Sequence, residues 1–305
     1  QGPVATAPIP PAPPRLSRSR RARGALAQGA VHACLAVSLV PLGAILFEIV
    51  SNGAPAISLT FFTADAPADP SLEPGTGGIR NALVGTLILM GLATTFAAPL
   101  GILTALFLTD VAASARPAIR RGGAAIGFVI DVLLGVPSIV AGLIVYLGVV
   151  VVMGHFSALA GGIALAVIMF PIVVRATEEI LRLVPEAQRE AALALGAPRW
   201  RTVWSVVLPA AAPGILTGVM LALARASGET APLLFTSLGN QFLSTDVLEP
   251  IAALPQLIFR YSIEFQTPES VEFSWGAALV LVSIILALNL VARLIASLTR
   301  SLETR

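Results

Sequence analysis

The sequence is poor in charge and contains no lysine. Charged residues make up only 12% of its 305 residues, against roughly 25% in soluble globular domains, and all 19 basic residues are arginines. Hydrophobic residues account for 56% of the chain, and its mean hydropathy is +0.88. These values exclude a soluble globular protein and predict an integral membrane protein. The formal net charge of +2 is too small to indicate a nucleic-acid partner.

Cysteine and histidine are almost absent. The single cysteine, Cys34, excludes a disulfide or a thiolate metal site within the chain. The two histidines, His32 and His155, lie far apart among apolar residues, so we expect a structural or interfacial role for each and no metal site. The sequence has no Walker A pattern, GxxxxGK[ST], and without lysine it cannot have one. Any ATP chemistry must therefore come from a separate protein.

Long apolar segments occupy most of the chain. Each is near or above the ~20 residues that cross a bilayer as a helix, so they predict an all-α membrane protein with six transmembrane helices. The segments are 26–50, 79–108, 124–153, 156–174, 210–235 and 274–297. Only Gly154 and His155 separate the third segment from the fourth, which predicts a tight helical hairpin there.

The remaining stretches form an arm and two long loops. Residues 1–24 are rich in proline and arginine, which predicts a disordered arm. A cleaved signal peptide is a poor fit because the apolar run that follows is too long, so we interpret the arm as a retained cytoplasmic anchor. Residues 25–78 are then the first transmembrane helix plus an extracytoplasmic loop, and 236–273 form a second extramembrane loop.

The arginines are distributed unevenly among the loops, which matters because cytoplasmic loops carry an excess of basic residues. The arginine-rich stretches hold Arg15, Arg18, Arg20, Arg21 and Arg23 in the arm, then Arg116, Arg120, Arg121, Arg175, Arg182, Arg189, Arg199 and Arg201, and finally Arg293, Arg300 and Arg305. The alternate loops hold only Arg80 and Arg260, with the acidic residues Asp65, Glu73, Asp246, Glu249 and Glu272. Both termini and the loop that follows the fourth segment are therefore predicted to be cytoplasmic.

The stretch 190–209 is the most polar between two apolar segments, and it predicts a short helix, a turn and a second short helix. Gly196 has the backbone freedom that the turn requires, and Pro198 suits the first turn of the second helix. One face of that helix is apolar, at Trp200, Val203, Trp204 and Val207. Such a face is suited to docking into a groove of another protein. An amphipathic segment lying on the membrane surface is the alternative.

The same stretch carries a family pattern. It reads E-A-A, three residues, Gly, nine residues, an aliphatic residue, any residue and Leu-Pro, here at Glu190, Ala191, Ala192, Gly196, Val206, Leu208 and Pro209. This pattern resembles the EAA loop of the permease subunits of ABC importers. The resemblance implies a type I importer permease domain over 79–298, whose coupling loop, 186–209, docks on a nucleotide-binding subunit. Glu190 would contact that subunit or cap the loop, and an unpaired, solvated glutamate is the alternative.

Three further stretches narrow the resemblance. They are GGIRNALVGTLIL (77–89), DVLLGVPSIVAGL (131–143) and ARASGETAPLLFT (224–236), and together they resemble the A-type permease of bacterial phosphate-specific ABC importers. Membership of that family implies a multi-pass protein of the bacterial cytoplasmic membrane that imports inorganic phosphate and is not itself an enzyme. It implies as partners a C-type permease subunit, a dimeric ATPase that binds ATP and Mg, and an extracytoplasmic phosphate-binding protein. A permease for another oxyanion, sulfate or molybdate, is the alternative.

Two charged residues in the fifth segment are candidates for the substrate path. An intramembrane arginine costs several kcal/mol unless it is paired or faces water. On one continuous helix, Arg225 and Glu229 share a face and can form an ion pair. Guanidinium binds phosphate bidentately, so we expect Arg225 to lower the barrier for phosphate. Glu229 is expected to hold the arginine or to accept a proton from the P–OH group of the substrate. A purely structural ion pair is the alternative. Gly228 and Pro232 weaken the helix locally and can bend it around a path, although glycine is also common at ordinary helix contacts. Thr230, next to Glu229, is a further candidate for the path.

The third segment contributes three more candidates. Pro137 is a helix breaker in mid-segment and frees a backbone carbonyl that Ser138 or a passing ligand can engage. Helix packing alone explains the kink equally well. Asp131, one turn before Gly135, is an intramembrane carboxylate that we expect to pair with an arginine of this chain or of the partner permease, without a specific residue being indicated.

Two other classes of membrane protein fit less well. A secondary transporter usually shows inverted repeats, and none is detected here. An intramembrane hydrolase needs a nucleophile and a base on facing helices, whereas His155 falls at a predicted hairpin tip and no GxSxG pattern occurs.

Overall fold

The computed structural model describes residues 18–69, 77–111 and 116–303, and the side chains of 18–23, 25 and 295–303 are not described. The predictions for residues 1–17, for Glu73 and for the arginines at 300 and 305 lie outside this description. The chain divides into two compact units, Gln1–Glu48 and Ile49–Arg305. In the first unit, helix α1 (Arg18–Gly53) begins, and the apolar stretch Leu26–Ala56 is long enough to cross a membrane.

The second unit is almost entirely helical. Among its described residues the β structure is limited to one isolated bridge between Leu238 and Ile251. Its elements are η1 (Ala54–Ala56), α2 (Leu59–Thr63), α3 (Arg80–Leu106), η2 (Phe107–Val111), α5 (Pro117–Gly135), α6 (Ser138–Val145), η3 (Tyr146–Val150), α7 (Val151–Met153), α8 (Ala158–Leu183), α9 (Glu186–Ala194), α10 (Arg199–Thr202), η4 (Val203–Val207), α11 (Leu208–Ala226), α12 (Ala231–Leu234), α13 (Leu254–Phe259), η5 (Arg260–Phe265) and α14 (Pro268–Glu303).

By length and composition, five helices of the described chain are long and apolar enough to cross a membrane, and there are six if one bent pair of helices is taken as a single span. The predicted all-α, six-span class is therefore confirmed. Inside the second unit, α3, α8 and α11 pack side by side and share the main hydrophobic core, with Leu89, Met169 and Ala222 fully buried in it. Small residues allow the close approach, because a methyl group on Gly214 would lie 2.7 Å from the side chain of Ile180.

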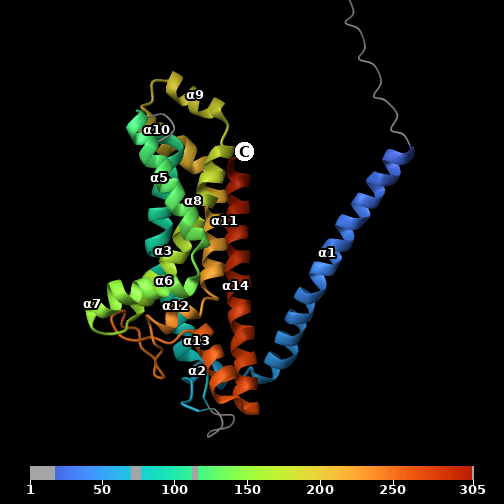
Figure 1. The fold of residues 1–305 in the computed structure, drawn as a ribbon, viewed down its shortest axis with the longest axis vertical. Coiled ribbons are helices and arrows are strands. Elements are labelled where there is room, and N and C mark those ends of the chain that lie inside the picture. Colours follow the sequence, from blue (N-terminus) through green and yellow to red (C-terminus); the bar gives the residue numbers. More distant parts are fainter. Residues whose placement is uncertain (1–17, 70–76, 112–115, 304–305) are drawn as a thin grey trace, which may run out of the picture. The chain divides into compact units, whose positions relative to one another are not determined.

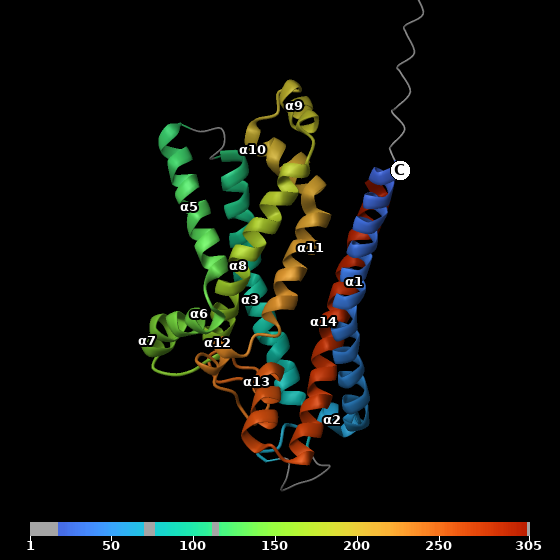
Figure 2. The same ribbon diagram turned by 45° about the vertical axis from the view of Figure 1, so that its right-hand side comes forward.

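The third predicted span is broken rather than continuous. Helix α5 ends at Gly135, and α6 leaves Pro137 at an angle of 109°. Figures 1 and 2 show α6 and α7 lying across the direction of α5 and α8. The predicted antiparallel hairpin at Gly154 and His155 is therefore wrong. Pro137 marks the break as expected, but the packing of α6 on α12 sets the size of the bend.

Two other segment ends also differ from the prediction. Helix α8 continues nine residues past 174 to Leu183, so Arg175 and Arg182 lie on a helix and not in a loop. Helix α11 ends at Ala226, well before the predicted end at 235, and the short helix α12 follows after a turn. Composition could not locate either end, because charged residues continue α8 and apolar residues continue beyond α11.

Opposite ends of the second unit are built differently. One end carries α9 and α10, and the other carries α2, α13 and the loop that precedes α13 (Figure 1). At the latter end Asp65 accepts hydrogen bonds from Arg80 at 2.9 and 3.0 Å and from the Leu243 N–H at 3.2 Å. The Arg80 hydrogen bond lowers the pKa of the Asp65 carboxyl below its ordinary value of 3.8. Asn81 donates to the carbonyls of Asn240 and Gln241, so the start of α3 holds this loop in place.

Candidate functional site

The stretch 186–209, called the helix–turn–helix segment below, has the predicted local structure. Helix α9 is followed by a turn in which Gly196 has φ +82°, and α10 begins directly after Pro198. A φ in this range favours glycine because other residues meet a clash between Cβ and the backbone. Pro209 lies in the first turn of α11, where its missing N–H costs no intrahelical bond.

The segment exposes its aromatic side chains. Trp200 is 67% exposed and Trp204 is 54% exposed, while Val207, on the same predicted face, is fully buried. The face is thus divided: its end nearest α11 packs into the core and its two tryptophans stay open. Leu195, in the turn, is 90% exposed as well. A group of large apolar side chains at the end of the bundle is typical of a surface that another protein covers.

The other predicted coupling residues lie in the same segment. Glu190 and Ala191 are exposed on α9, Ala192 is half-buried, and Leu208 is half-buried at the start of α11. No ion pair joins Glu190 to another described residue. The structure therefore leaves open both roles predicted for this glutamate, a contact with a separate subunit and a solvated side chain.

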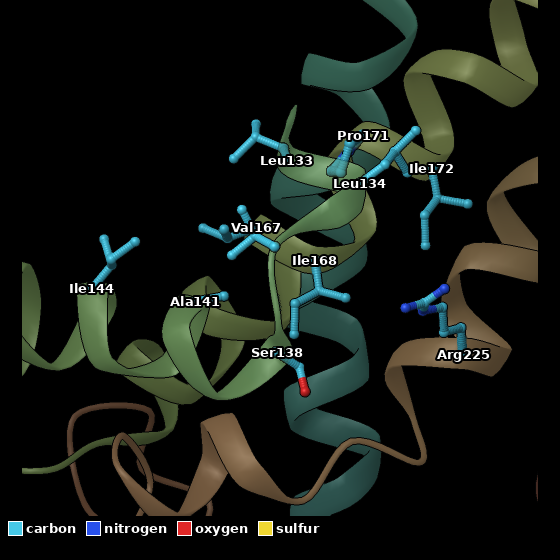
Figure 3. Close-up of a pocket in the computed structure, with 11 residues that line it drawn as sticks. Leu133, Leu134, Ser138, Ala141, Ile144, Val167, Ile168, Pro171, Ile172 and Arg225 are labelled. Carbon is cyan, nitrogen blue, oxygen red and sulfur yellow. The ribbon is translucent and has the colours of Figure 1, made fainter. Parts of the chain in front are cut away.

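A second candidate site is a cavity between four helices (Figure 3). Arg225, in the last turn of α11, lines it together with Ser138 at the start of α6. The other lining side chains are apolar and come from α5, α6 and α8 and from the α5–α6 break, including Leu133, Ile168 and Ile172. Figure 3 shows the guanidinium group directed toward Ile168 and Ile172. Two of the predicted path residues thus meet in one cavity, whereas Asp131, Pro137, Gly228, Glu229 and Thr230 are not among its lining residues.

The predicted ion pair between Arg225 and Glu229 is absent from the structure. The two residues do not share a helix face, because α11 ends at Ala226 and the chain turns through Ser227–Thr230. The turn is closed by hydrogen bonds from the Gly228 N–H to the Arg225 carbonyl and from the Glu229 N–H to the Ala226 carbonyl, at 3.3 and 3.1 Å. Arg225 is exposed and forms no ion pair with any described residue.

Asp131 does pair with an arginine, and that arginine is Arg175 on α8. Nε and Nη2 of Arg175 lie 3.0 and 2.6 Å from one Asp131 carboxylate oxygen, and its Nη1 lies 2.5 Å from Glu178. Glu178 also accepts from Arg182 at 2.5 Å. The cluster joins α5 to α8, and its charges balance. Sequence reasoning missed Arg175 and Glu178. The spacing could have indicated them, because Arg175 and Glu178 are three residues apart and Glu178 and Arg182 are four apart, as in helical ion pairs.

Broken helices around an arginine-lined cavity and an exposed helix–turn–helix segment at one end define an all-helical, multi-pass membrane protein of the permease type. The model of the family described as binding-protein-dependent transport system inner membrane component matches residues 97–301. The chain belongs to this family. It is therefore a multi-pass transport component of the cytoplasmic membrane that works with other components of an ABC importer, and the resemblance seen in the EAA pattern is confirmed.

Individual relatives are similar over most of the chain. The phosphate transport system permease protein PstA of Yersinia pestis is 46% identical over 252 residues, which are 82% of each protein. PstA of Haemophilus influenzae is 42% identical and covers 90% of this chain and 94% of its own length. A chain of the MetNI methionine ABC transporter, solved in inward-facing conformations, is 20% identical with a TM-score of 0.56 and covers 73% of this chain and 94% of its own length. The last comparison supports the type I importer permease fold.

Proposed function

We propose that the protein is a membrane-spanning permease subunit of an ATP-driven importer of inorganic phosphate. The relatives named as phosphate transport permeases support the substrate. The observation that carries the site is the cavity that Arg225 lines together with Ser138, without an ion-pair partner for the arginine among the described residues. An arginine that faces an apolar wall without a carboxylate is available to an anion from the transport path.

The proposed importer contains three further kinds of subunit besides this chain. A C-type permease forms a heterodimer with this chain, a dimeric ATPase binds ATP and Mg, and an extracytoplasmic binding protein delivers phosphate. The exposed tryptophans of the helix–turn–helix segment support docking on the ATPase, because their burial in a cleft removes apolar surface from water. Docking on the ATPase requires the segment to face the cytoplasm, and the arginine-rich loops predict that it does.

The mechanism is alternating access. The binding protein releases phosphate into the path between the two permeases, where Arg225 replaces part of the water that hydrates the anion. Ser138 donates a hydrogen bond to a phosphate oxygen, and Glu229, half-buried just beyond α11, accepts one from the protonated oxygen. ATP binding closes the ATPase dimer, and the helix–turn–helix segment passes that movement to α11. Hydrolysis then resets the cycle.

Glu229 bears on the choice of anion. A carboxylate beside the path accepts a hydrogen bond from the P–OH group of phosphate but repels sulfate, which is fully ionised. Glu229→Gln removes the repulsion and is expected to let sulfate compete with phosphate. Glu229 thus partly discriminates phosphate from sulfate.

The test is ATP-dependent uptake by the complete complex in proteoliposomes. Arg225→Gln is expected to lower phosphate uptake by about 10- to 100-fold, because charge-assisted hydrogen bonds contribute about 1.5–3 kcal/mol and about 1.4 kcal/mol is tenfold. Arg120→Gln, at an exposed arginine of α5, is the matched control. Normal phosphate uptake by Arg225→Gln would contradict the proposal that Arg225 stabilises phosphate in the transport path. If sulfate inhibits phosphate uptake by the wild-type complex as strongly as unlabelled phosphate does, the substrate is a broader class of oxyanions and not phosphate alone.

A further inference from the structure

Arg189 connects the helix–turn–helix segment to two helices of the membrane-spanning bundle. It lies on α9, and its guanidinium forms an ion pair with Asp110 in η2, at the end of α3. The same side chain donates from Nη2 to the Leu181 carbonyl, at 3.2 Å, at the end of α8. The Thr109 hydroxyl donates to the other oxygen of Asp110 at 3.3 Å. One arginine therefore holds α9 against the ends of both α3 and α8.

This contact stands out because α9 is otherwise open. None of the residues of α9 is buried, and the helix packs mainly on α10 and η4, which belong to the same segment. By contrast, only 19% of the Arg189 side chain and 16% of the Asp110 side chain are exposed. The ion pair is thus the most enclosed part of the contact between α9 and the bundle.

The ion pair borders a cavity on one side. A cavity of about 420 Å³ lies between the ends of α3 and α8 and the start of α9, and both Asp110 and Arg189 line it. A pair that borders such a cavity is able to separate and re-form at less than the full desolvation cost of a completely buried pair. The end of α3 is also irregular, since Phe107–Val111 form a π-helix, a local distortion that is frequent at functional sites.

We propose that Arg189 transmits the movement of the helix–turn–helix segment to α3 through Asp110. This inference rests on the proposed function, in which an ATPase moves that segment. The chain itself connects the segment to α8, through Val184 and Pro185, and to α11, through η4, but it does not connect the segment directly to α3. Helix α3 packs along α8 through most of the core, so a pull on Asp110 and on Leu181 moves both helices together. The ion pair gives the segment that the ATPase moves a direct contact with α3, which the chain itself does not provide.

The test compares phosphate uptake with ATP hydrolysis in the complete importer. In Asp110→Asn and in Arg189→Gln, assembly and ATP hydrolysis are expected to persist while uptake per ATP falls about fivefold or more, as for typical couplings between sites. The charge-swapped double variant, Asp110→Arg with Arg189→Asp, is expected to recover part of the loss. Arg116→Gln removes one positive charge from an exposed position at the start of α5 and is the matched control.

A milder variant protects the test against loss of assembly. In Arg189→Lys the ammonium group still pairs with Asp110 but lacks the planar fork that also reaches the Leu181 carbonyl, so assembly is retained and uptake per ATP falls less than in Arg189→Gln. Wild-type uptake per ATP in the assembled variants would make the pair a static anchor and overturn the proposal. The proposal would also be overturned if ATPase binding fell in the variants by the same factor as uptake, because Arg189 would then serve docking and not the transmission of movement. Phosphate uptake by the wild-type importer tests the proposed function, whereas uptake per ATP in the variants tests the role of Arg189. Failure of one proposal can therefore be told apart from failure of the other.

Discussion

Single hydroxyl groups in the core of the bundle have very different surroundings. Thr177 on α8 is 1% exposed, and its Oγ1 has no hydrogen-bond partner among the described residues. Thr86 on α3 is equally enclosed, but its hydroxyl donates to the Ala82 carbonyl at 2.7 Å and accepts from the Leu254 N–H at 2.9 Å. Since an unpaired buried hydroxyl costs free energy and a paired one does not, the two threonines contribute to stability with opposite signs.

Replacing each threonine by valine, which has nearly the same shape, measures this difference. Thr177→Val is expected to be neutral or to raise the free energy of unfolding by about 1 kcal/mol, because it removes an unsatisfied polar atom. Thr86→Val is expected to lower it by about 1–3 kcal/mol, because the Leu254 N–H is left without an acceptor. The measurement is the thermal midpoint of the purified complex. A lower midpoint for Thr177→Val would show that its hydroxyl has a partner in the assembled importer.

At the scale of residues, the sequence pointed to two side chains that line the cavity, Arg225 and Ser138, but not to the side chains that form ion pairs across helices. Arg225 and Ser138 were recognisable because a charge and a proline-linked break inside apolar segments have few structural explanations. The partner of Asp131 was not recognisable, because Arg175 lies 44 positions away and only the packing of α5 on α8 brings it near. Ion pairs across helices leave no periodic trace in a sequence.

At the scale of elements, the crossing of α6 and α12 depends on one glycine. A Cβ atom at Gly142 would lie 2.5 Å from the Cα of Pro232 and 3.3 Å from its carbonyl oxygen. These are backbone atoms, so no side-chain rotation relieves the overlap. Both helices follow breaks in longer apolar segments, α6 after Pro137 and α12 after the turn at Ser227–Thr230. The crossing therefore fixes where the two broken helices meet, next to the cavity that holds Arg225.

Gly142→Ala is expected to force α6 and α12 apart. The cost is about 1–3 kcal/mol of the free energy of unfolding, the usual range for overpacking, with a matching loss of uptake because the cavity changes shape. Gly148→Ala is the control, because a Cβ at Gly148 meets no atom within 4 Å. The control is expected to stay within about 0.5 kcal/mol of the wild type. Thermal midpoints and uptake rates of the two variants are compared, and equal behaviour would contradict a close crossing.

The sequence located helices more reliably than it located their ends. All six apolar segments contain a helix, since long apolar runs have few alternatives in a membrane. The 109° bend after α5 was not predictable from Pro137 alone, because a proline interrupts a helix without setting the direction of the next one. That direction comes from the contact between Gly142 and Pro232, two residues 90 positions apart.

At the scale of the whole molecule, the second unit has two ends suited to different tasks. The end with α9 and α10 exposes Trp200 and Trp204, and Arg189 ties it to the bundle. At the opposite end, the loop before α13 is fastened to the start of α3 through Asn81 and to the start of α8, where the Ala158 N–H donates to the Glu249 carbonyl at 2.9 Å. One end is open to a partner and the other is closed by hydrogen bonds. The arginine distribution predicts which of them faces the cytoplasm.

The predicted orientation can be measured on single-cysteine variants, because Cys34 is the only native cysteine and is removed by Cys34→Ser. Ala118→Cys lies between Arg116 and Arg120 at the start of α5, and Thr245→Cys lies in the loop before α13; both positions are exposed. Since basic loops stay in the cytoplasm, a membrane-impermeant maleimide is expected to label Thr245→Cys in right-side-out vesicles and Ala118→Cys only in inside-out vesicles. The reverse pattern would invert the chain in the membrane. It would also put the helix–turn–helix segment on the side where no ATP is available, and so remove the ATPase as its partner.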